Sequence, residues 1–354
     1  MNTNGVILVT GGAGFIGSHV VDALVSDGHQ VRVLDALLPL AHGGKPGYLN
    51  PGAEYVHGDI ADVDLVQRCL DGVSAVSHQA SMVGLGTDIG DIADYVRHND
   101  GGTASLLFAA HRRGSIGRIV LGSSMVVYGE GRYRCNEHGI VRPPPRPRQR
   151  LEARAFEPPC PLCGRDLVAE PVPEDAPVDP RNVYAATKLH QEHLCQAFAR
   201  ESDASVVVLR YHNVYGPRMP QRTPYAGVAS IFRSAIEAGE APRVFEDGCQ
   251  MRDFVHVRDV ARANVLALGE EAPRGTFNIA SGQPHTVGDM ASALARSSDG
   301  AAEPVVTGEY RLGDVRHVFA SIDRARAELG YRPQVAFEDG MREFAGAELR
   351  PPSR

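Results

Sequence analysis

Short apolar runs alternate with stretches of helical spacing through the first 210 residues of the chain. The apolar runs have the length and valine-rich composition of buried strands. They are residues 5–10, 30–35, 53–58, 73–78, 117–124 and 204–210. The stretches of helical spacing are residues 15–27, 63–70, 95–113 and 182–201. Strands alternating with helices in this way predict an α/β fold, with a doubly wound parallel sheet covered by helices.

The alternating pattern breaks between residues 143 and 180. This stretch contains 11 of the chain's 24 prolines, and proline cannot continue a helix or a central strand. It is also rich in arginine, so we expect an irregular excursion from the sheet, with residues 130–176 as an insertion. Beyond residue 211 the elements become shorter and more varied. The pattern therefore predicts a first domain of residues 1–210 and a smaller α/β domain of residues 211–354, with some segments interleaved.

Composition and charge narrow the class of protein. The chain has 354 residues, of which 43% are hydrophobic and 22% charged, which is ordinary for a globular protein. A formal net charge of -7 argues against general affinity for nucleic acid or an anionic membrane. No apolar run approaches the roughly 18 residues that a membrane span needs, and the first residues lack the features of a secretory signal. We therefore expect a cytoplasmic protein with neither a membrane nor a nucleic acid as partner.

A glycine-rich turn joins the first predicted strand to the first predicted helix. Gly11, Gly14 and Gly17 follow the strand at a spacing of three, and the next strand ends at Asp35. Glycines let a pyrophosphate approach the backbone N–H groups and the positive end of a helix, and an acidic residue at this distance binds a ribose. The carboxylate would also repel a 2′-phosphate, which favours NAD over NADP. The alternative is an ordinary tight turn beside a solvated aspartate.

A second pattern predicts catalytic side chains on the helix at 182–201. Tyr184 and Lys188 are four residues apart, so their side chains share one helix face. A neighbouring ammonium, together with the positive nicotinamide of NAD, would lower the pKa of a phenol and make it a usable base. Ser124, at the end of a predicted strand, is placed to bind the same substrate hydroxyl. The alternative is a surface pair on an amphipathic helix.

Taken in order, several motifs resemble the extended short-chain dehydrogenase/reductase superfamily in its nucleotide-sugar epimerase/dehydratase branch. They span nearly the whole chain and include TGGAGFIGSHV, HQAS, HNDGGT, SSMVVYG, YAATK, LRYHNVYGP, MRDFVHVRDVA and GDVRH. The resemblance implies a Rossmann domain that holds NAD tightly and a smaller C-terminal domain that binds a nucleotide-diphospho-sugar. It also implies a homodimer, formed through the helices at 95–113 and 184–201.

The resemblance also implies binding residues, matched motif by motif. The implied cofactor contacts are Gly11, Gly14, Phe15, Ile16, Gly17, Asp35, Asp59, Ile60, Gln79, Ala80, Ser81, Asn99, Tyr184, Lys188, Tyr211 and His212. The implied substrate contacts are Ser124, Tyr184, Asn213, Arg252 and Arg316. Four of these have a second interpretation: Asp59 as a helix cap, His212 as a packed histidine, and each of the two arginines as a solvated charge.

Within this branch, the segment before Tyr128 is similar to that of a 4-epimerase, such as UDP-glucose 4-epimerases and relatives of dTDP-L-rhamnose 4-epimerase. The dehydratases carry an acid and a glutamate where this chain has Met125 and Val126, which cannot transfer protons. The resemblance thus implies inversion at C4 of the sugar through a transient 4-keto sugar. The alternatives are a 4-reductase or dehydratase of the same family, or a non-catalytic protein that senses NAD or binds nucleic acid through the arginine-rich insertion. The sugar and the nucleotide stay open.

Four residues of the insertion have the spacing of a metal site. Cys135 and His138 form one pair, and Cys160 and Cys163 form a second within CPLCG. Three thiolates and one imidazole can close a tetrahedron around Zn²⁺ and leave no open position for catalysis. The sequence therefore predicts a structural zinc site resembling a zinc knuckle, the alternative being unpaired thiols in a loose insertion.

Overall fold

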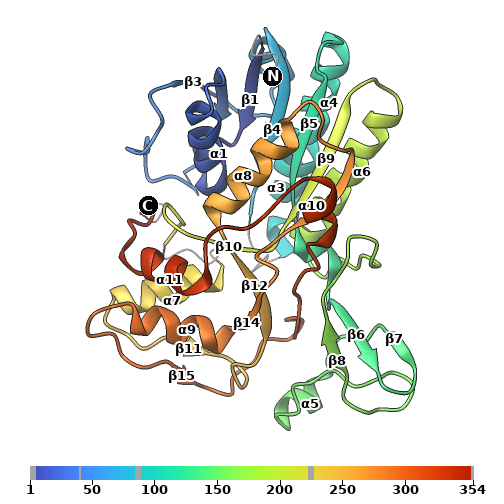
Figure 1. Cartoon of the computed structure of the whole chain (residues 1–354), viewed down its shortest axis with the longest axis vertical. Helices are drawn as coiled ribbons and strands as arrows, with labels where there is room; N and C mark the ends of the chain where they lie inside the picture. Colours follow the sequence, from blue (N-terminus) through green and yellow to red (C-terminus); the bar gives the residue numbers. More distant parts are fainter. Residues whose placement is uncertain (1–4, 40, 84–88, 222–226, 352–354) are drawn as a thin grey trace.

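The protein is built around one parallel sheet of seven strands (Figure 1). The structure is a computed structural model that describes residues 5–39, 41–83, 89–221 and 227–351. The sheet order is β13-β9-β5-β4-β1-β2-β3, and every pair of neighbouring strands is parallel. The strands are β1 (Val6–Thr10), β2 (Val31–Asp35), β3 (Ala53–His57), β4 (Val73–His78), β5 (Arg118–Ser124), β9 (Ser205–Tyr211) and β13 (Gly275–Ile279).

Six of these strands lie where the apolar runs predict them. The seventh, β13, comes from the second half of the chain and pairs with β9 at the sheet edge. The predicted parallel, doubly wound sheet is therefore confirmed, and the strand from residues 275–279 extends it. Central strands such as β9 are buried along their whole length, which explains why they are continuous apolar runs.

Helices cover both faces of the sheet. On one face, α2, α4 and α6 enclose a core that includes Leu8, Val76, Leu106 and Ile119. On the other face, α1 and α8 pack together over β1 and β2, and α10 packs on β13. The helices are α1 (Phe15–Ser26), α2 (Val63–Cys69), α4 (Gly102–Arg113), α6 (Val183–Arg200), α8 (Val257–Leu268) and α10 (Asp323–Glu328).

The stretch predicted as one helix over residues 95–113 consists of three parts. A short α3 (Ile92–Tyr95) runs into a π-helical segment (Val96–Gly101), which continues as α4. The wider π turn contains Asn99, whose side chain is fully buried. Such insertions in a helix are frequent at functional sites.

A smaller unit from the second half of the chain lies below the sheet in Figure 1. It has a three-stranded sheet in the order β10-β12-β14, a two-stranded sheet of β11 and β15, and three helices around a core of its own. These elements are β10 (Asn213–Tyr215), β11 (Arg243–Val244), β12 (Met251–His256), β14 (Pro284–Thr286), β15 (Val305–Val306), α7 (Val228–Glu237), α9 (Val287–Arg296) and α11 (Phe337–Gly346). α8 and β13 come from the second half of the chain but pack on or pair with the large sheet, so segments of the two units alternate along the chain.

The insertion projects from the carboxyl side of β5, at the lower right of Figure 1. It is more regular than its prolines suggest, because it contains a three-stranded antiparallel sheet in the order β7-β6-β8 and a short helix. These are β6 (Arg132–Cys135), β7 (Gly139–Val141), β8 (Val168–Glu170) and α5 (Arg148–Glu152). Its own apolar core contains only four buried residues, Tyr133, Cys135, Cys160 and Leu167.

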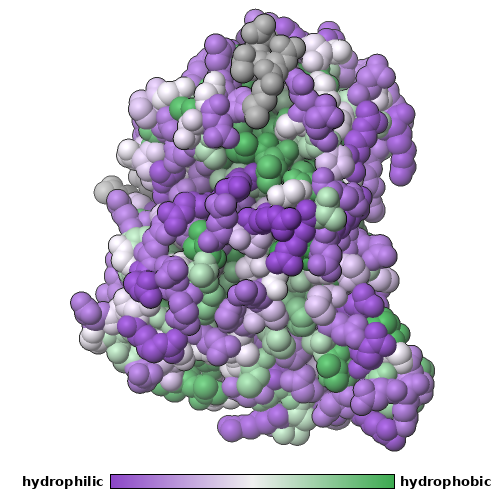
Figure 2. Space-filling model, in the orientation of Figure 1, coloured by the Kyte–Doolittle hydropathy of each residue, from purple (hydrophilic) through white to green (hydrophobic). Residues whose placement is uncertain are grey.

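The face of the molecule that Figure 2 shows is rich in polar residues, as expected for a globular protein of ordinary composition. Figure 2 shows a mostly hydrophilic face with small hydrophobic patches. Within the described residues, none of the helices combines the length and the apolar character that crossing a bilayer requires.

Candidate active site

The glycine-rich turn lies between β1 and α1, at the carboxyl edge of the large sheet. Gly11 has a φ of 68°, and a Cβ atom there would lie 2.7 Å from the Cα of Ala80. A Cβ on Gly17 would lie 2.1 Å from the carbonyl oxygen of Gly11. Both positions therefore require glycine. The helix starts after Gly14 with no side-chain cap among the described residues, so its first N–H groups can bind an anion.

Asp35 lies beside this turn at the end of β2. Its carboxylate accepts hydrogen bonds from the backbone N–H groups of Ala13 (2.9 Å) and Leu37 (2.8 Å). These bonds fix the carboxylate at the cavity wall, and a carboxylate has further lone pairs to accept bonds from ribose hydroxyls. This position is compatible with the predicted contact to the adenosine ribose of NAD, which stays a prediction.

Asp59 also lies on the cavity wall, after β3. Its side chain accepts a hydrogen bond from the N–H of Ala61 at 2.9 Å. The residue that caps α2 is Asp62, which accepts from the N–H of Leu65 at 3.0 Å. The alternative interpretation of Asp59 as a helix cap is therefore wrong.

The three predicted catalytic side chains meet at the same edge of the sheet. Ser124 ends β5, and its side chain hydrogen-bonds the hydroxyl of Tyr184. Tyr184 and Lys188 lie one turn apart near the start of α6, and both are buried. The ammonium of Lys188 donates to Gln191 Oε1 (2.9 Å) and to Ser81 Oγ (3.4 Å). The interpretation of Tyr184 and Lys188 as an exposed surface pair is therefore wrong.

The electrostatics of this group differ from the sequence-based expectation. Burial raises the pKa of Tyr184, and only the hydrogen bond from Ser124 acts in the opposite direction. Burial also lowers the pKa of Lys188, to about 8. The chain's own groups therefore do not lower the pKa of the phenol. A lowered pKa of Tyr184 would therefore require a positive charge from outside the chain.

A cavity of about 1510 Å³ connects the glycine turn with the catalytic group and the smaller unit. Most predicted site residues line it, although they come from widely separated positions of the chain. These are Gly11, Gly14, Phe15, Ile16, Gly17, Asp35, Asp59, Ile60, Gln79, Ala80, Ser81, Ser124, Tyr184, Lys188, Tyr211, His212, Asn213 and Arg252.

Asn99, predicted as a cofactor contact, does not line this cavity. Its amide oxygen accepts from the N–H of Met82 and from Ser81, and its NH₂ group donates to the carbonyl of Met82 and to Thr187. The side chain is saturated by these bonds. Its role in the structure is to tie the loop after β4 to α6, which differs from the prediction.

Arg316, predicted as a diphosphate contact, also lies outside the cavity lining. Its guanidinium is 1% exposed and binds three carboxylates, those of Glu157, Glu246 and Asp247, at 2.6–2.9 Å. The prediction does not fit this arrangement, because no donor of the guanidinium points at the cavity. The alternative of a solvated charge does not fit either.

The smaller unit contributes Asn213 and Arg252 to the lining of the cavity. The guanidinium of Arg252 donates to the backbone carbonyls of Met251, Val315 and Arg316, each at 2.8 Å. Burial lowers the pKa of Arg252. His212 is buried next to Asn213, and burial lowers its pKa to about 3, so this imidazole is neutral.

Two residues at the site, Gln191 and Glu246, were not predicted from the sequence. Gln191, three residues after Lys188, is fully buried and holds the ammonium, and its i, i+3 spacing could have indicated this. Glu246 lines the cavity and binds Arg146 and Arg316. Because Arg146 is 100 residues away in the chain, no local pattern indicates that pairing.

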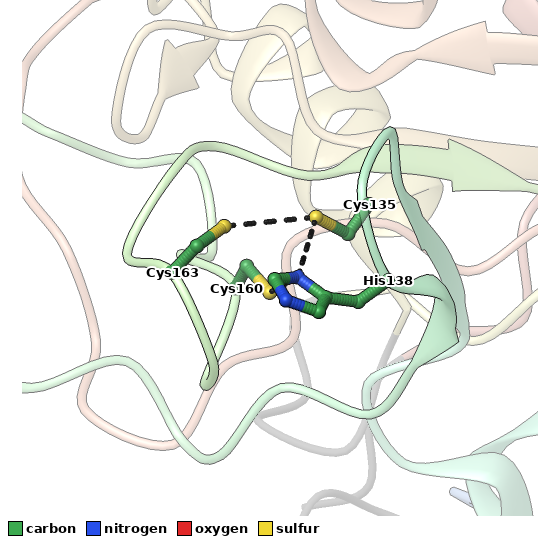
Figure 3. Close-up of side chains that lie close together, drawn as sticks. All are labelled: Cys135, His138, Cys160 and Cys163. Carbon is green, nitrogen blue, oxygen red and sulfur yellow. Dashed lines mark hydrogen bonds between the residues drawn. The ribbon is translucent and has the colours of Figure 1, made fainter.

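The four predicted metal ligands lie together within the insertion and point toward one another (Figure 3). Their ligand atoms all lie within 4.8 Å of one another. The Sγ of Cys135 is 3.4 Å from Nδ1 of His138 and 3.7 Å from the Sγ of Cys163, and the Sγ of Cys160 is 3.7 Å from the same Nδ1. A hydrogen bond from the backbone N–H of Glu137 is the main cause that lowers the pKa of Cys135 to about 6.

The chain is similar in sequence to known proteins along most of its length. A sequence model described as the NAD dependent epimerase/dehydratase family matches residues 7–150 and 164–280. A dTDP-L-rhamnose 4-epimerase of Burkholderia thailandensis is 35% identical over 344 residues, which cover 96% of this chain and 93% of that protein.

Two crystal structures are similar along almost their whole length. A UDP-glucose 4-epimerase of Thermotoga maritima with UDP-glucose gives a TM-score of 0.80 at 32% identity, covering 96% of this chain and 97% of that one. A UDP-glucose 4-epimerase of Thermus thermophilus in complex with NAD gives a TM-score of 0.76 at 30% identity, with the same coverage of both chains.

Proposed function

We propose, from the premise that this chain belongs to the NAD-dependent epimerase/dehydratase family, that it inverts C4 of a nucleotide-diphospho-sugar with NAD as a resident cofactor. The observation that carries the proposal is the single cavity. It joins a glycine turn with Asp35 at one end to Ser124, Tyr184 and Lys188 in the middle. The similar proteins named as 4-epimerases support the reaction type.

The residues present fit NAD. The turn requires glycine at Gly11 and Gly17, and the uncapped start of α1 offers N–H groups to a pyrophosphate. Asp35 is positioned for the adenosine ribose, and its charge excludes a 2′-phosphate. When bound, NAD takes up the C4 hydride of the sugar and returns it.

The chain's own residues move the proton and hold the sugar. Tyr184, as phenolate, accepts the proton of the C4 hydroxyl, and Ser124 bridges the two oxygens. Lys188 is held by Gln191 and Ser81, which keeps its positive charge one helical turn from the phenol. On the return step, Tyr184 gives the proton back to the same oxygen. Met125 and Val126 offer no second acid or base, so the elimination of a dehydratase is not supported.

The test is a panel of nucleotide-diphospho-sugars followed by NMR. UDP-glucose, dTDP-L-rhamnose and ADP- or GDP-linked heptoses are incubated with the purified protein without added NAD. We expect inversion at C4 of one of them, with an equilibrium mixture of both epimers. Consumption of added reduced cofactor in proportion to product would indicate a 4-reductase, and no change in any sugar would contradict the proposal.

We also propose that Cys135, His138, Cys160 and Cys163 hold a structural Zn²⁺. With Zn–S bonds of about 2.3 Å, a regular tetrahedron separates two sulfurs by about 3.8 Å. The 3.7 Å between Cys135 and Cys163 matches this value, and the two S–N distances of 3.4 and 3.7 Å are also consistent with it. Four protein ligands leave no position for substrate, so the metal would hold the insertion together.

Elemental analysis tests the zinc proposal. The purified wild type should contain about one zinc per chain, and a Cys160→Ser, Cys163→Ser double variant should contain none. The Cys249→Ser variant is the matched control, because Cys249 is exposed and lies outside the cluster. A wild type purified without chelator that carries no metal would contradict the proposal.

We propose a homodimer formed through the helices around residues 92–113 and α6. Three large apolar side chains on the first of these segments, Ile92, Val96 and Phe108, are 47–50% exposed. A partner that covers them would remove apolar surface from water. Light scattering after gel filtration should give twice the 38.0 kDa chain mass, and a Phe108→Glu variant should shift it to the monomer. A monomeric wild type would contradict this.

A further inference from the structure

We propose that the insertion positions the diphosphate end of the substrate site, and that Arg146 and Glu157 are its positioning residues. The inference rests on the proposed function, because it assigns these residues to the binding of a nucleotide diphosphate. Both residues lie between His138 and Cys160 in the chain, inside the segment that the metal ligands enclose. Neither touches the cavity, so they act through residues that do.

Arg146 connects the insertion to the cavity wall. Its guanidinium, 6% exposed, donates to both carboxylate oxygens of Glu246 at 2.9 and 2.7 Å and to the backbone carbonyl of Asp314 at 2.9 Å. Glu246 and Asp314 both line the cavity. A forked guanidinium that binds a carboxylate and a carbonyl together fixes their relative position.

Glu157 makes a second connection, to Arg316 and His317. Its Oε1 accepts from Nε and one terminal nitrogen of Arg316, at 2.9 and 2.6 Å. Its Oε2 lies 2.9 Å from Nε2 of His317, whose Nδ1 accepts from the N–H of Met251, so Nε2 carries the proton and donates. The remaining donors of Arg316 bind Glu246 and Asp247.

Two side chains at the start of the insertion bind backbone N–H groups of the segment that contains Arg316 and His317. Glu130 accepts from the N–H of Arg316 at 2.6 Å, and the hydroxyl of Tyr133 accepts from the N–H of His317 at 3.0 Å. Tyr133 is fully buried and lies two residues before the metal ligand Cys135. The insertion therefore holds residues 314–317 by both side-chain and main-chain bonds.

This segment in turn positions Arg252. The guanidinium of Arg252 donates to the carbonyls of Val315 and Arg316, while Arg252 itself lines the cavity. Residues 311–315 also line it. The guanidinium of Arg252 is partly buried, so leaving it without these carbonyl partners would be costly. Arg252 is thus placed by a segment whose geometry depends on Arg146 and Glu157.

The test compares Arg146→Gln with Arg148→Gln. Arg148 is exposed and lies two residues further along the same insertion, which makes it a matched control. Binding of UDP, dTDP, ADP and GDP to the NAD-loaded protein is measured by calorimetry, and the nucleotide that the wild type binds most tightly is used. We expect Arg146→Gln to weaken binding by about 10-fold or more, as expected for the loss of charged buried hydrogen bonds. Arg148→Gln should stay within about 2-fold.

Three further measurements separate positioning from general damage. In Arg146→Gln, the NAD content and zinc content should equal those of the wild type, and KM of a turned-over sugar should rise with little change in kcat. Glu157→Gln keeps the size of the side chain and loses the charge, so it should weaken nucleotide binding by a smaller factor. A double variant should show non-additive effects, because Arg146 binds Glu246, Glu157 binds Arg316, and Arg316 and Glu246 bind each other.

The inference is overturned if Arg146→Gln binds the nucleotide as the wild type does, or if it loses NAD in parallel with the nucleotide. A wild type that binds none of these four nucleoside diphosphates would also overturn it. Its failure differs from that of the proposed function. Unchanged nucleotide binding in the variant leaves C4 inversion standing, whereas a wild type that binds nucleotide but inverts no sugar contradicts only the epimerase.

Discussion

The catalytic edge of the large sheet and the insertion are held together by different forces. At the sheet edge, Tyr184 and Lys188 are positioned by a helix packed on strands that are buried along their length. The insertion has an apolar core of four buried residues, and its structure relies on a cysteine–histidine cluster and on arginine–carboxylate pairs. The sheet edge is therefore stabilised by burial of apolar surface, while the insertion depends on directed contacts that single substitutions can break.

This difference predicts two kinds of variant. A substitution at the sheet edge should abolish activity while the protein stays folded, and a substitution in the insertion should unfold the insertion while NAD stays bound. We expect NAD binding to survive loosening of the insertion, because no residue of the insertion belongs to the three cores that enclose the sheet. Four changes test this contrast.

The largest expected effect follows Tyr184→Phe. The variant keeps the ring but loses the hydroxyl that accepts the C4 proton, so kcat should fall by about 10²–10⁴-fold. NAD content and the unfolding midpoint should stay close to those of the wild type. Tyr310→Phe is the control, since Tyr310 does not line the cavity. A Tyr184→Phe enzyme with more than about a tenth of wild-type kcat would show that another group moves the proton.

The next effect is local unfolding of the insertion when its cluster is removed. In the Cys160→Ser, Cys163→Ser variant, trypsin should cut the arginine-rich segment about 10-fold faster or more, because metal binding and folding are coupled. Bound NAD, read from absorbance after denaturation, should be retained. Cleavage at the wild-type rate would mean that the insertion folds without its cluster.

A smaller effect is expected at the adenosine end of the cavity. Asp35→Asn removes the charge but keeps the bonds to the turn within reach, so NAD affinity should fall by about 10-fold and discrimination against NADP should weaken. Calorimetry with both cofactors on stripped protein measures this. Equal discrimination in the variant and the wild type would exclude Asp35 as the selecting residue.

The smallest effect is on stability against pH. Burial lowers the pKa of His78, His212 and His256 to about 3. The unfolded chain takes up these protons near pH 6.5 and the folded chain does not, so their contribution to stability is present above that pH and is lost as the pH falls toward 3. At pH 5.5, protonation of each of these histidines in the unfolded chain lowers the free energy of unfolding by about 1.4 kcal/mol.

Urea unfolding at pH 7.0 and 5.5 measures the loss of stability, and the His212→Phe variant should lose less than the wild type. If the variant loses as much as the wild type, His212 does not contribute to the pH dependence.

The charge pairs of the insertion should be lost at a lower pH than the contributions of these histidines. Burial tends to raise the pKa of Glu157, but hydrogen bonds from His317 and Arg316 hold it below its usual value. Its contribution is therefore present above the ordinary glutamate pKa and is lost only below it.

The sequence predicts the sheet edge well because its determinants are local. Six strands, the turn at Gly11 and the Tyr184–Lys188 pair each follow from spacing within a few residues. The strand at 275–279 was missed, since it is short and follows the break in the alternating pattern. The small sheet of the insertion was also missed, because prolines hide its short strands.

The contacts between distant segments were beyond reach of the sequence. Arg316 was assigned to the substrate, yet its partners Glu157 and Glu246 lie 159 and 70 residues away. Asn99 was assigned to the cofactor, although it holds a loop. A guanidinium or an amide binds any suitably placed acceptor, so the sequence alone does not identify which one.

The fate of the hydrogen on C4 tests the central claim most directly. The nucleotide-diphospho-sugar that the enzyme inverts is prepared with deuterium at C4 and converted in ordinary water. If the hydride leaves and returns within the cavity while Tyr184 handles only the hydroxyl proton, the inverted product keeps its deuterium at C4. Replacement of that deuterium by hydrogen from the solvent during inversion would contradict the account.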